Sequence, residues 1–230
     1  MLVSVIIPAL NEAQNIRQCV DAARREYAGN RVEIVVVDGG STDGTLDQVP
    51  AGVVTLSAPR GRALQMNHGA RASRGQFLVF CHADTQLPAG WHEAVTTALS
   101  RPGVSGGTFR SRLAPEVGLL RLGNRLSIPA WWPWMLGDQA QLMSRATFEQ
   151  LGGFPEIPLM EDLEMIRALR RSGRLVRLPL RVTTSSRRFV EHGVLRQTLL
   201  DLLLEAQYLL LGVSPEDLAR YYVSSRKESV

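Results

Sequence analysis

The sequence predicts an α/β fold with a mostly parallel central sheet that helices cover on both faces. Short apolar runs rich in β-branched residues alternate with helical patterns along the first half of the chain. These runs are continuously apolar, which is typical of strands buried on both faces of a parallel sheet. With 230 residues, 45% hydrophobic and 21% charged, the chain can bury a sizeable core, and disordered, collagen-like and disulfide-scaffold classes are excluded.

The first half of the chain predicts alternating strands and helices. Strands are expected at residues 3–7, 32–37, 53–56 and 77–81, with helices at 12–27, 42–49 and 62–73. The second half is less regular. Its expected elements are strands at 104–110 and 139–143 and helices at 116–127, 161–171 and 195–211. No internal repeat, low-complexity segment or linker interrupts the chain, so a single domain spanning residues 1–230 is expected.

The positive charge is concentrated in one segment. Lys227 is the only lysine among 26 basic residues, and residues 167–196 hold nine arginines against one acid, Glu191. Codon bias would explain the shortage of lysine. Phosphate recognition would explain the local excess, because a guanidinium binds phosphate oxygens in a bidentate manner. A nucleic-acid binder is disfavoured, since such proteins spread their basic residues and interleave aromatics.

The two cysteines and the amino-terminal residues favour a cytoplasmic protein. Cys19 and Cys81 have no zinc-site spacing and are expected to be buried and reduced. The first eight residues lack the charged start of a secretory signal and predict a strand. No apolar stretch reaches the length of a membrane span.

Polar segments follow the predicted strands. They comprise residues 8–12, 38–44, 59–62 and 82–84. Ligands of parallel α/β sheets bind at the carboxyl ends of the strands, so these segments are expected to form a site. Taken singly, each motif has a structural alternative. Asp38 could accept a nucleobase N–H or form a turn, Asp84 could bind a divalent cation or lie in a solvated loop, and Asp162 could be a general base or a helix-dipole partner.

The order of the motifs resembles the family 2 glycosyltransferases of the GT-A fold. The resemblance runs over about residues 3–190 and rests on Pro-Ala-Leu-Asn-Glu at 8–12, Asp-Gly-Gly-Ser-Thr-Asp-Gly at 38–44, Gly-Arg-Ala-Leu-Gln-Met-Asn-His-Gly at 61–69, His-Ala-Asp at 82–84, Gly-Gly-Phe at 152–154 and Met-Glu-Asp at 160–162. It implies a half that binds a nucleotide sugar, residues 1–112, and a half that binds the acceptor, residues 113–230. The implied activity is inverting, metal-dependent transfer of a sugar from a UDP- or GDP-sugar to a hydroxyl.

The same resemblance implies a role for each site residue. The donor nucleotide would be bound by Pro8, Asn11, Glu12, Asp38, Gly39, Arg62, His82, Ala83 and Asp84. The donor sugar and diphosphate would be bound by Gly106, Gly107, Arg187 and Arg188. Asp162 would be the catalytic base, and the acceptor would contact Trp131, Trp132, Gly153, Phe154 and Glu161. Mn²⁺ or Mg²⁺ would be held by Asp84, with His192 as a further ligand.

Two departures from the family pattern keep other functions open. His82 replaces the first aspartate of the Asp-x-Asp motif, which leaves one carboxylate fewer for a metal. The Gln-x-x-Arg-Trp motif is absent, which disfavours processive synthesis. The alternatives are a nucleotidyltransferase acting on sugar phosphates and a nucleotide-binding module without catalysis.

The acceptor and its setting are the least defined. Trp131 and Trp132 could stack on a sugar, lie at a membrane interface or pack in the core. The leucine-rich helix at 195–211 has one polar stripe, and packing against the sheet is favoured over a membrane contact. A lipid-linked acceptor and a peripheral position at the inner face of the membrane stay open, as does the oligomeric state.

Overall fold

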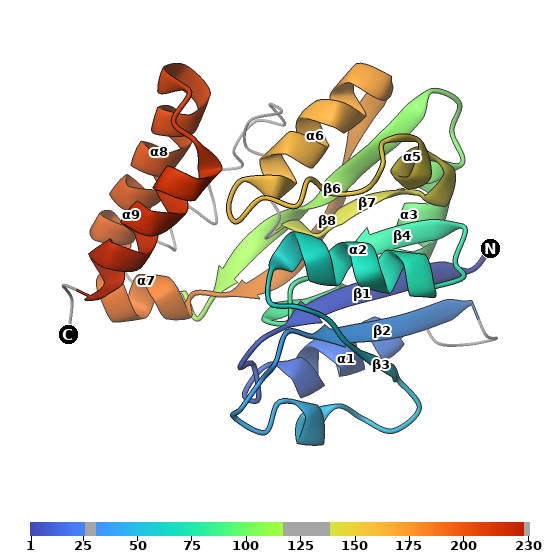
Figure 1. Cartoon of the computed structure of the whole chain (residues 1–230). Helices are drawn as coiled ribbons and strands as arrows, with labels where there is room; N and C mark the ends of the chain where they lie inside the picture. The colour runs from blue at the N-terminus through green and yellow to red at the C-terminus, as the bar shows by residue number, and fades with distance from the viewer. Residues whose placement is uncertain (26–30, 117–138, 228–230) are drawn as a thin grey trace.

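A computed structural model of the chain describes residues 1–25, 31–116 and 139–227 and contains one mixed sheet (Figure 1). The strands are β1 (Val3–Ala9), β2 (Val32–Asp38), β3 (Val54–Ser57), β4 (Phe77–Phe80), β5 (Thr85–Gln86), β6 (Val104–Ala114), β7 (Gln141–Ser144) and β8 (Arg174–Ser185). Their order across the sheet is β3-β2-β1-β4-β7-β6-β8-β5. β7 runs antiparallel to β4 and β6, and β5 runs antiparallel to β8, whereas the other described pairings are parallel. The predicted mostly parallel sheet is confirmed.

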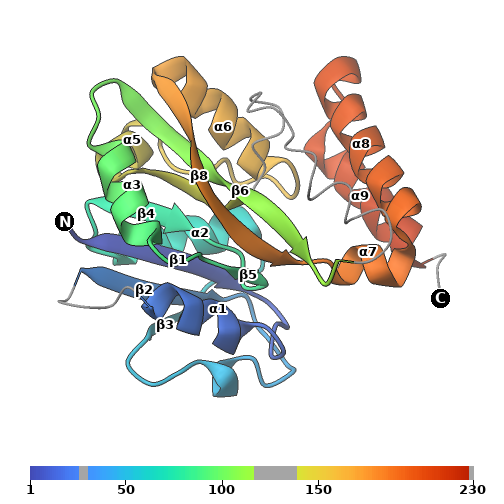
Figure 2. The same ribbon diagram turned by 180° about the vertical axis from the view of Figure 1, so that it is seen from behind.

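Helices cover both faces of this sheet. They are α1 (Ile16–Arg24), α2 (Arg62–Ala72), α3 (Trp91–Leu99), α5 (Arg145–Gln150), α6 (Glu161–Ser172), α7 (Arg187–His192), α8 (Val194–Leu211) and α9 (Pro215–Lys227), with a 3₁₀ turn at Leu46–Gln48. α1 and α3 lie on one face, and α2, α5 and α6 lie on the other (Figures 1 and 2). The predicted α/β class with helices on both faces is therefore confirmed.

The strand β1 divides the core between these two faces. Val3, Val5 and Ile7 pack toward α1 and α3, whereas Ile6 packs toward α2. This alternation follows from the two-residue period of a strand. Since both sides are buried, the run has no polar face, which is why the sequence is continuously apolar there.

Several elements differ from their predicted ranges. The helix expected from residue 12 begins at Ile16, because the residues before it form the loop that follows β1. The helix expected at 42–49 is a single 3₁₀ turn, because Asp43 and Thr45 bond to that same loop. The helix expected at 116–127 lies outside the described residues, apart from Glu116. α3, α5, β8, α7 and α9 were not predicted.

The carboxyl-terminal helices do not cover the sheet. α8 and α9 stand beside it, where Leu204 and Leu218 pack against Met160 and Leu163 near the start of α6 (Figure 1). The prediction that residues 195–211 pack against the sheet is therefore wrong. Several leucines of α8 are exposed as a result, Leu199 at 66% among them. Within the part of the chain that the structure describes, no helix has the length and apolarity to cross a membrane.

Candidate functional site

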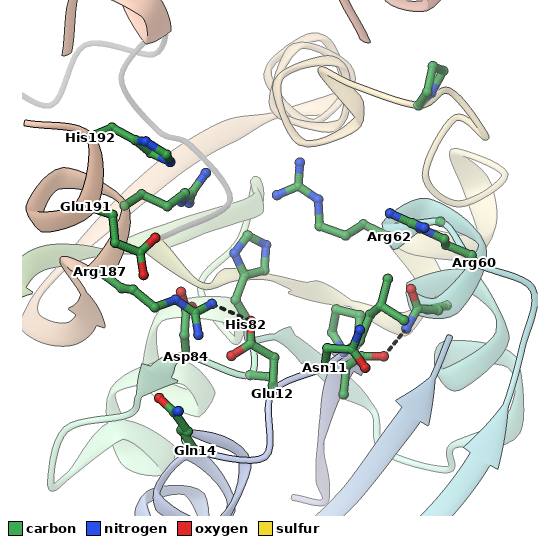
Figure 3. A pocket seen from close by; sticks show the side chains of 18 residues that line it. Asn11, Glu12, Gln14, Arg60, Arg62, His82, Asp84, Arg187, Glu191 and His192 are labelled. Carbon is green, nitrogen blue, oxygen red and sulfur yellow. Dashed lines mark hydrogen bonds and ion pairs between the residues drawn. The ribbon is translucent and has the colours of Figure 1, made fainter. Parts of the chain in front are cut away.

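A cleft of about 830 Å³ lies at the carboxyl ends of β1 and β4 (Figure 3). The sheet order changes direction between these strands, since the chain first builds outward to β3 and then returns to place β4 beside β1. Such switch points are where α/β sheets bind ligands. The cleft is lined by Pro8, Ala9, Leu10, Asn11, Glu12, Gln14, Arg60, Gly61, Arg62, Gln65, His82, Ala83, Asp84, Pro158, Arg187, Arg188, Glu191 and His192.

The loop after β1 is held by the loop after β2. The side-chain oxygen of Asn11 accepts a hydrogen bond from the backbone N–H of Thr42, at 2.9 Å, and the N–H of Asn11 donates to Ser41 Oγ. The N–H of Glu12 donates to Thr45 Oγ1 at 2.8 Å. Asn11 also has a φ of +55°, a left-handed conformation that asparagine tolerates better than most residues. These contacts fix the edge of the cleft before any ligand arrives.

Asp38 supports this edge from behind. Its carboxylate is 4% exposed and accepts hydrogen bonds from the backbone N–H groups of Gly40 and Ser41. Neither Asp38 nor Gly39 lines the cleft. Gln65, which the sequence analysis missed, donates through Nε2 to the carbonyls of Ala9 and Val37 at 2.8 Å and so ties β1 to β2. The structure thus shows Asp38 holding a turn behind the cleft, and its predicted contact with a nucleobase stays a prediction.

The loop His82-Ala83-Asp84 follows β4 and enters the cleft. The thiols of Cys19 and Cys81 both approach the carbonyl oxygen of His82, at 3.4 and 3.6 Å, and hold the loop from the core side. Both cysteines are free and buried, as predicted. Burial and, to a smaller extent, the charge of Arg62 lower the pKa of His82 to about 4, against the opposing effect of Asp84. The imidazole is therefore neutral at pH 7 and can act as a hydrogen-bond donor and acceptor.

Arg62 begins α2 and connects the cleft to the start of α6. Its Nε lies 2.8 Å from Oε1 of Glu161, which is 1% exposed. The distance is that of an ion pair, yet neither carboxylate oxygen of Glu161 has a hydrogen bond of good geometry within the described residues. Burial raises the pKa of Glu161 to about 6, although the charge of Arg62 lowers it. Glu161 does not itself line the cleft.

Asp162 lies next to this ion pair in the first turn of α6. Its Oδ1 accepts a hydrogen bond from the N–H of Leu163 at 2.8 Å, and its backbone carbonyl accepts one from Gln141 Nε2 at 2.9 Å. Its charge, like that of Asp84, raises the pKa of His82, so both carboxylates act on the same imidazole. Asp162 lies outside the lining of the cleft but is electrostatically coupled to it.

The Gly152-Gly153-Phe154 segment has a packing role. Asn67 donates to the carbonyl of Phe154 at 2.9 Å and accepts from its N–H at 2.8 Å. The ring of Phe154 is 3% exposed and packs edge-on against Phe80, with centroids 4.8 Å apart. Gly153 has a φ of +87°, and a Cβ there would lie 2.7 Å from Asn67 Oδ1. The contacts of Gly153 and Phe154 in the structure are packing contacts, and their predicted contact with the acceptor stays a prediction.

Gly106 and Gly107 are likewise explained by packing. Both lie near the start of β6, paired with Met143 and Leu142 of β7. A Cβ on Gly107 would lie 1.9 Å from the carbonyl oxygen of Val176 in β8, and one on Gly106 would lie 2.7 Å from that of Leu142. Neither glycine lines the cleft. The close approach of neighbouring strands accounts for both glycines, and their predicted contact with the donor sugar stays a prediction.

The cleft combines arginines from both halves of the chain. Arg60 and Arg62 precede and begin α2, whereas Arg187 and Arg188 lie at the start of α7. Arg187 Nη2 reaches Glu12 Oε1 at 3.2 Å and so connects the two halves (Figure 3). The other seven arginines of residues 167–196 lie outside the lining, on α6, β8 and α8. Of the nine arginines in the segment that was predicted to face phosphate, only Arg187 and Arg188 therefore line the cleft.

The described residues do not contain a preformed metal cage. No group of three or more histidine, cysteine, aspartate or glutamate side chains is placed to hold an ion within them. Asp84 and His192 both line the cleft, but Arg187 and Arg188 line it too. Mg²⁺ and Mn²⁺ are commonly held by one or two carboxylates together with substrate phosphates and water. The residues present fit an ion that arrives with a diphosphate.

The cleft brings together many of the predicted site residues. Those in its lining are Pro8, Asn11, Glu12, Arg62, His82, Ala83, Asp84, Arg187, Arg188 and His192. Trp131 and Trp132 lie outside the described residues. Gln65 and Glu191 were missed, although Gln65 stands in a motif that the sequence analysis quoted. Arg60 lies in the segment 59–62 that was expected in the site but was given no role of its own.

Comparison with known proteins finds a matching family model and relatives over part of the chain. The model of the family described as Glycosyl transferase family 2 matches residues 4–143. Glycosyltransferase AglE of Haloferax volcanii is 34% identical over 111 residues, which are 44% of this chain and 36% of that protein. A PGL/p-HBAD biosynthesis glycosyltransferase of Mycobacterium bovis is 37% identical over 108 residues, which are 41% of this chain and 38% of that protein. The matches thus span little more than a third of these relatives.

Solved structures share the fold over most of the chain. The mannosyltransferase PcManGT of Pyrobaculum calidifontis, solved with GDP-Man and Mn²⁺, has a TM-score of 0.68 at 24% identity and covers 92% of this chain and 64% of its own. TarS 1–349 of S. aureus, solved with UDP, has a TM-score of 0.65 at 17% identity and covers 80% of this chain and 60% of its own. At these identities the likeness concerns the fold, which is that of the GT-A glycosyltransferases.

Proposed function

Because the chain belongs to glycosyl transferase family 2, we propose that it transfers a sugar from a UDP- or GDP-sugar to an acceptor hydroxyl, with inversion at the anomeric carbon. The observation that carries the proposal is the cleft itself. Four arginines and Asp84 converge on it at the carboxyl ends of β1 and β4. This arrangement suits a ligand with a diphosphate group, since guanidinium groups bind phosphate oxygens and a carboxylate can hold a bridging cation.

The start of α2 adds to the attraction for phosphate. Gly61 and Arg62 line the cleft at the amino-terminal end of this helix. A helix N-terminus carries partial positive charge and exposed N–H groups, both of which favour an anion. Arg60 and Arg62 from this side, and Arg187 and Arg188 from the other, would hold the diphosphate as it leaves.

Asp84 is the proposed metal ligand. It would hold Mn²⁺ or Mg²⁺ together with the diphosphate, and the bound ion would neutralise charge that develops on the leaving group. Relatives in fold support this, because PcManGT was solved with Mn²⁺ and GDP-Man. His192 lines the same cleft and is a second candidate ligand.

Asp162 is the proposed general base. In this role it would take the proton from the acceptor hydroxyl as the oxygen attacks the anomeric carbon. Glu161, buried beside it without a hydrogen bond of good geometry among the described residues, would accept a hydrogen bond from another acceptor hydroxyl. The acceptor would then enter between the start of α6 and the cleft.

A panel of nucleotide sugars with Mn²⁺ tests this function. Thermal shift would identify the nucleotide by the donor that raises the melting temperature, and a transfer assay with hydroxyl acceptors would follow release of the nucleoside diphosphate. A donor that binds but is neither transferred nor hydrolysed would favour a binding module, an alternative that His82 in place of an aspartate supports. Release of pyrophosphate from a nucleoside triphosphate and a sugar phosphate would indicate a nucleotidyltransferase.

A further inference from the structure

The helix α8 presents an apolar stripe to solvent. The exposed fractions are 66% for Leu195 and Leu199, 41% for Leu202, 45% for Leu203 and 80% for Leu210. At about 100° per residue, these five side chains lie within roughly 100° of one another around the helix axis. Together with the half-buried Ala206 they form what is called here the leucine stripe.

The opposite side of α8 makes the contacts that hold it in place. Leu204 is buried and packs with Met160, Leu163 and Leu218. Tyr208 packs beside them and donates its hydroxyl to Glu164 at 2.8 Å. The helix is therefore anchored through one side, and the packing of the fold itself turns the leucine stripe outward.

The charges of α8 are segregated in the same way. Asp201 is half-buried and accepts a hydrogen bond from the buried Gln197 at 2.7 Å, on the anchored side. Helical spacing places Glu205 away from the stripe as well. Arg196 is exposed and lies at the margin of the stripe, next to Leu195 in the sequence. The stripe thus has a cation at its border and no acid within it.

We propose that the leucine stripe docks α8 onto the surface of a bilayer that contains anionic lipid. A helix with an apolar face and flanking arginine lies in the plane of the membrane interface, with its leucines among the acyl chains and its cations near the phosphates. α8 is too charged on its other side to span the membrane, in agreement with the absence of a spanning helix among the described residues. This inference goes beyond the proposed function and does not depend on it.

A second copy of the chain is a poorer occupant. From Leu195 to Leu210 the stripe is roughly 22 Å long and roughly 10 Å wide, so two stripes face to face would bury only about 500 Å². Stable interfaces bury about 1,200 Å² or more. A bilayer has no such requirement, because each leucine that enters the acyl region contributes by itself.

The cleft is continuous with the docking helix. Arg188, Glu191 and His192 of α7 line the cleft, and Gly193 joins α7 directly to α8. Docking through the stripe would place this side of the cleft at the membrane surface. An acceptor held in the membrane would then reach the site without leaving the lipid.

Co-sedimentation with vesicles tests the proposal. The full chain is mixed with vesicles of phosphatidylcholine alone, or with about one third phosphatidylglycerol, and the bound fraction is measured. Binding is expected to the anionic vesicles and to weaken at high salt. The double variant Leu199→Gln and Leu203→Gln is expected to bind at least ~10-fold more weakly, since it removes two apolar side chains from the surface that enters the acyl region.

A matched control separates the stripe from general surface hydrophobicity. Val54 is 44% exposed on the edge strand β3, and Leu46 is 42% exposed in the 3₁₀ turn before that strand, both remote from α8 (Figure 1). Leu46→Gln with Val54→Gln should leave vesicle binding unchanged. Arg196→Gln, which changes an exposed side chain, should weaken binding to anionic vesicles alone. It therefore tests the proposal even if the leucine variant fails to fold.

Three outcomes would overturn the proposal. These are no binding of the wild-type chain to either vesicle, equal losses in the stripe and control variants, and a solution dimer that the stripe substitutions dissociate. Donor binding, followed by thermal shift with the nucleotide panel, should be the same in all variants. A failure of the proposed function would appear in that measurement and not in the vesicle assay.

Discussion

Nε of Arg62 lies 2.8 Å from the buried carboxylate of Glu161, and this contact joins the start of α2 to the start of α6. The two residues come from opposite halves of the chain, and each stands beside a proposed functional group. Arg62 lines the cleft, and Glu161 precedes Asp162. Arg62 is 40% exposed, so water can solvate its guanidinium group. Glu161 is buried, so water cannot solvate its carboxylate. The charged form of the Glu161 carboxylate is therefore destabilised by burial, and this carboxylate lies next to the site.

Glu161→Gln is expected to make the fold more stable at neutral pH. A carboxyl whose pKa is raised in the folded state contributes stability while it is protonated. For Glu161 this contribution is present below about pH 4.5 and is lost as the pH rises through about 6. The variant should match the wild type at about pH 4.5 and exceed it by about 2 kcal/mol at pH 7. Urea denaturation at several pH values measures this difference.

Glu149→Gln provides the control, because Glu149 is 64% exposed and its contact with Arg145 is 4.0 Å long. Its stability relative to the wild type should change little over the same pH range. If Glu161→Gln were less stable than the wild type at pH 7, the attraction between Arg62 and Glu161 would outweigh the cost of burying the carboxylate. The pKa of Glu161 would then not be raised in the folded protein.

Asp84→Ala should abolish the effect of metal on donor binding. Since no cage of three ligands exists within the described residues, the wild type should bind Mn²⁺ weakly alone and at least ~10-fold more tightly with a nucleoside diphosphate present. Calorimetric titration of Mn²⁺ with and without the nucleotide measures this coupling. Tight Mn²⁺ binding by the chain alone, or unchanged coupling in Asp84→Ala, would contradict the assignment.

Asn67→Ala should destabilise the fold without changing donor affinity. Asn67 is 1% exposed, and its amide satisfies both the N–H and the carbonyl of Phe154. Truncation leaves both groups buried without these partners, at a cost of about 2–4 kcal/mol. Urea denaturation and nucleotide titration distinguish the two effects. A loss of donor affinity at temperatures where the variant is folded would show that Asn67 contributes to the site directly.

Much of the fold was predictable because the strands near the amino terminus are buried on both faces. In β1 and β2 the apolar runs matched the strands to within two residues. β8 was missed because Arg174–Ser185 places arginines among its apolar residues along a strand that is only partly buried. α3 was missed because its apolar residues, from Trp91 to Leu99, are interrupted by threonines and a histidine.

The lining of the cleft was predictable at strand ends, as at Glu12 and Asp84. Sequence position alone did not show where a motif residue also supports the backbone. Asp38, Gly107 and Phe154 are each explained by contacts with neighbouring loops or strands, and only the three-dimensional structure shows which strands approach closely enough to require glycine.

Asp162→Asn should reduce turnover roughly 10²- to 10⁴-fold, which is the usual contribution of a general base, and leave donor affinity within about twofold. The amide keeps the size of the side chain and can still accept the hydrogen bond from Leu163, so the start of α6 should be preserved. Steady-state transfer rates and donor titration measure the two effects. Asp21→Asn on the exposed side of α1 is the control and should change neither. Near-normal turnover in Asp162→Asn would assign the proton transfer to another group, of which Glu161, buried beside Asp162, is the first to test.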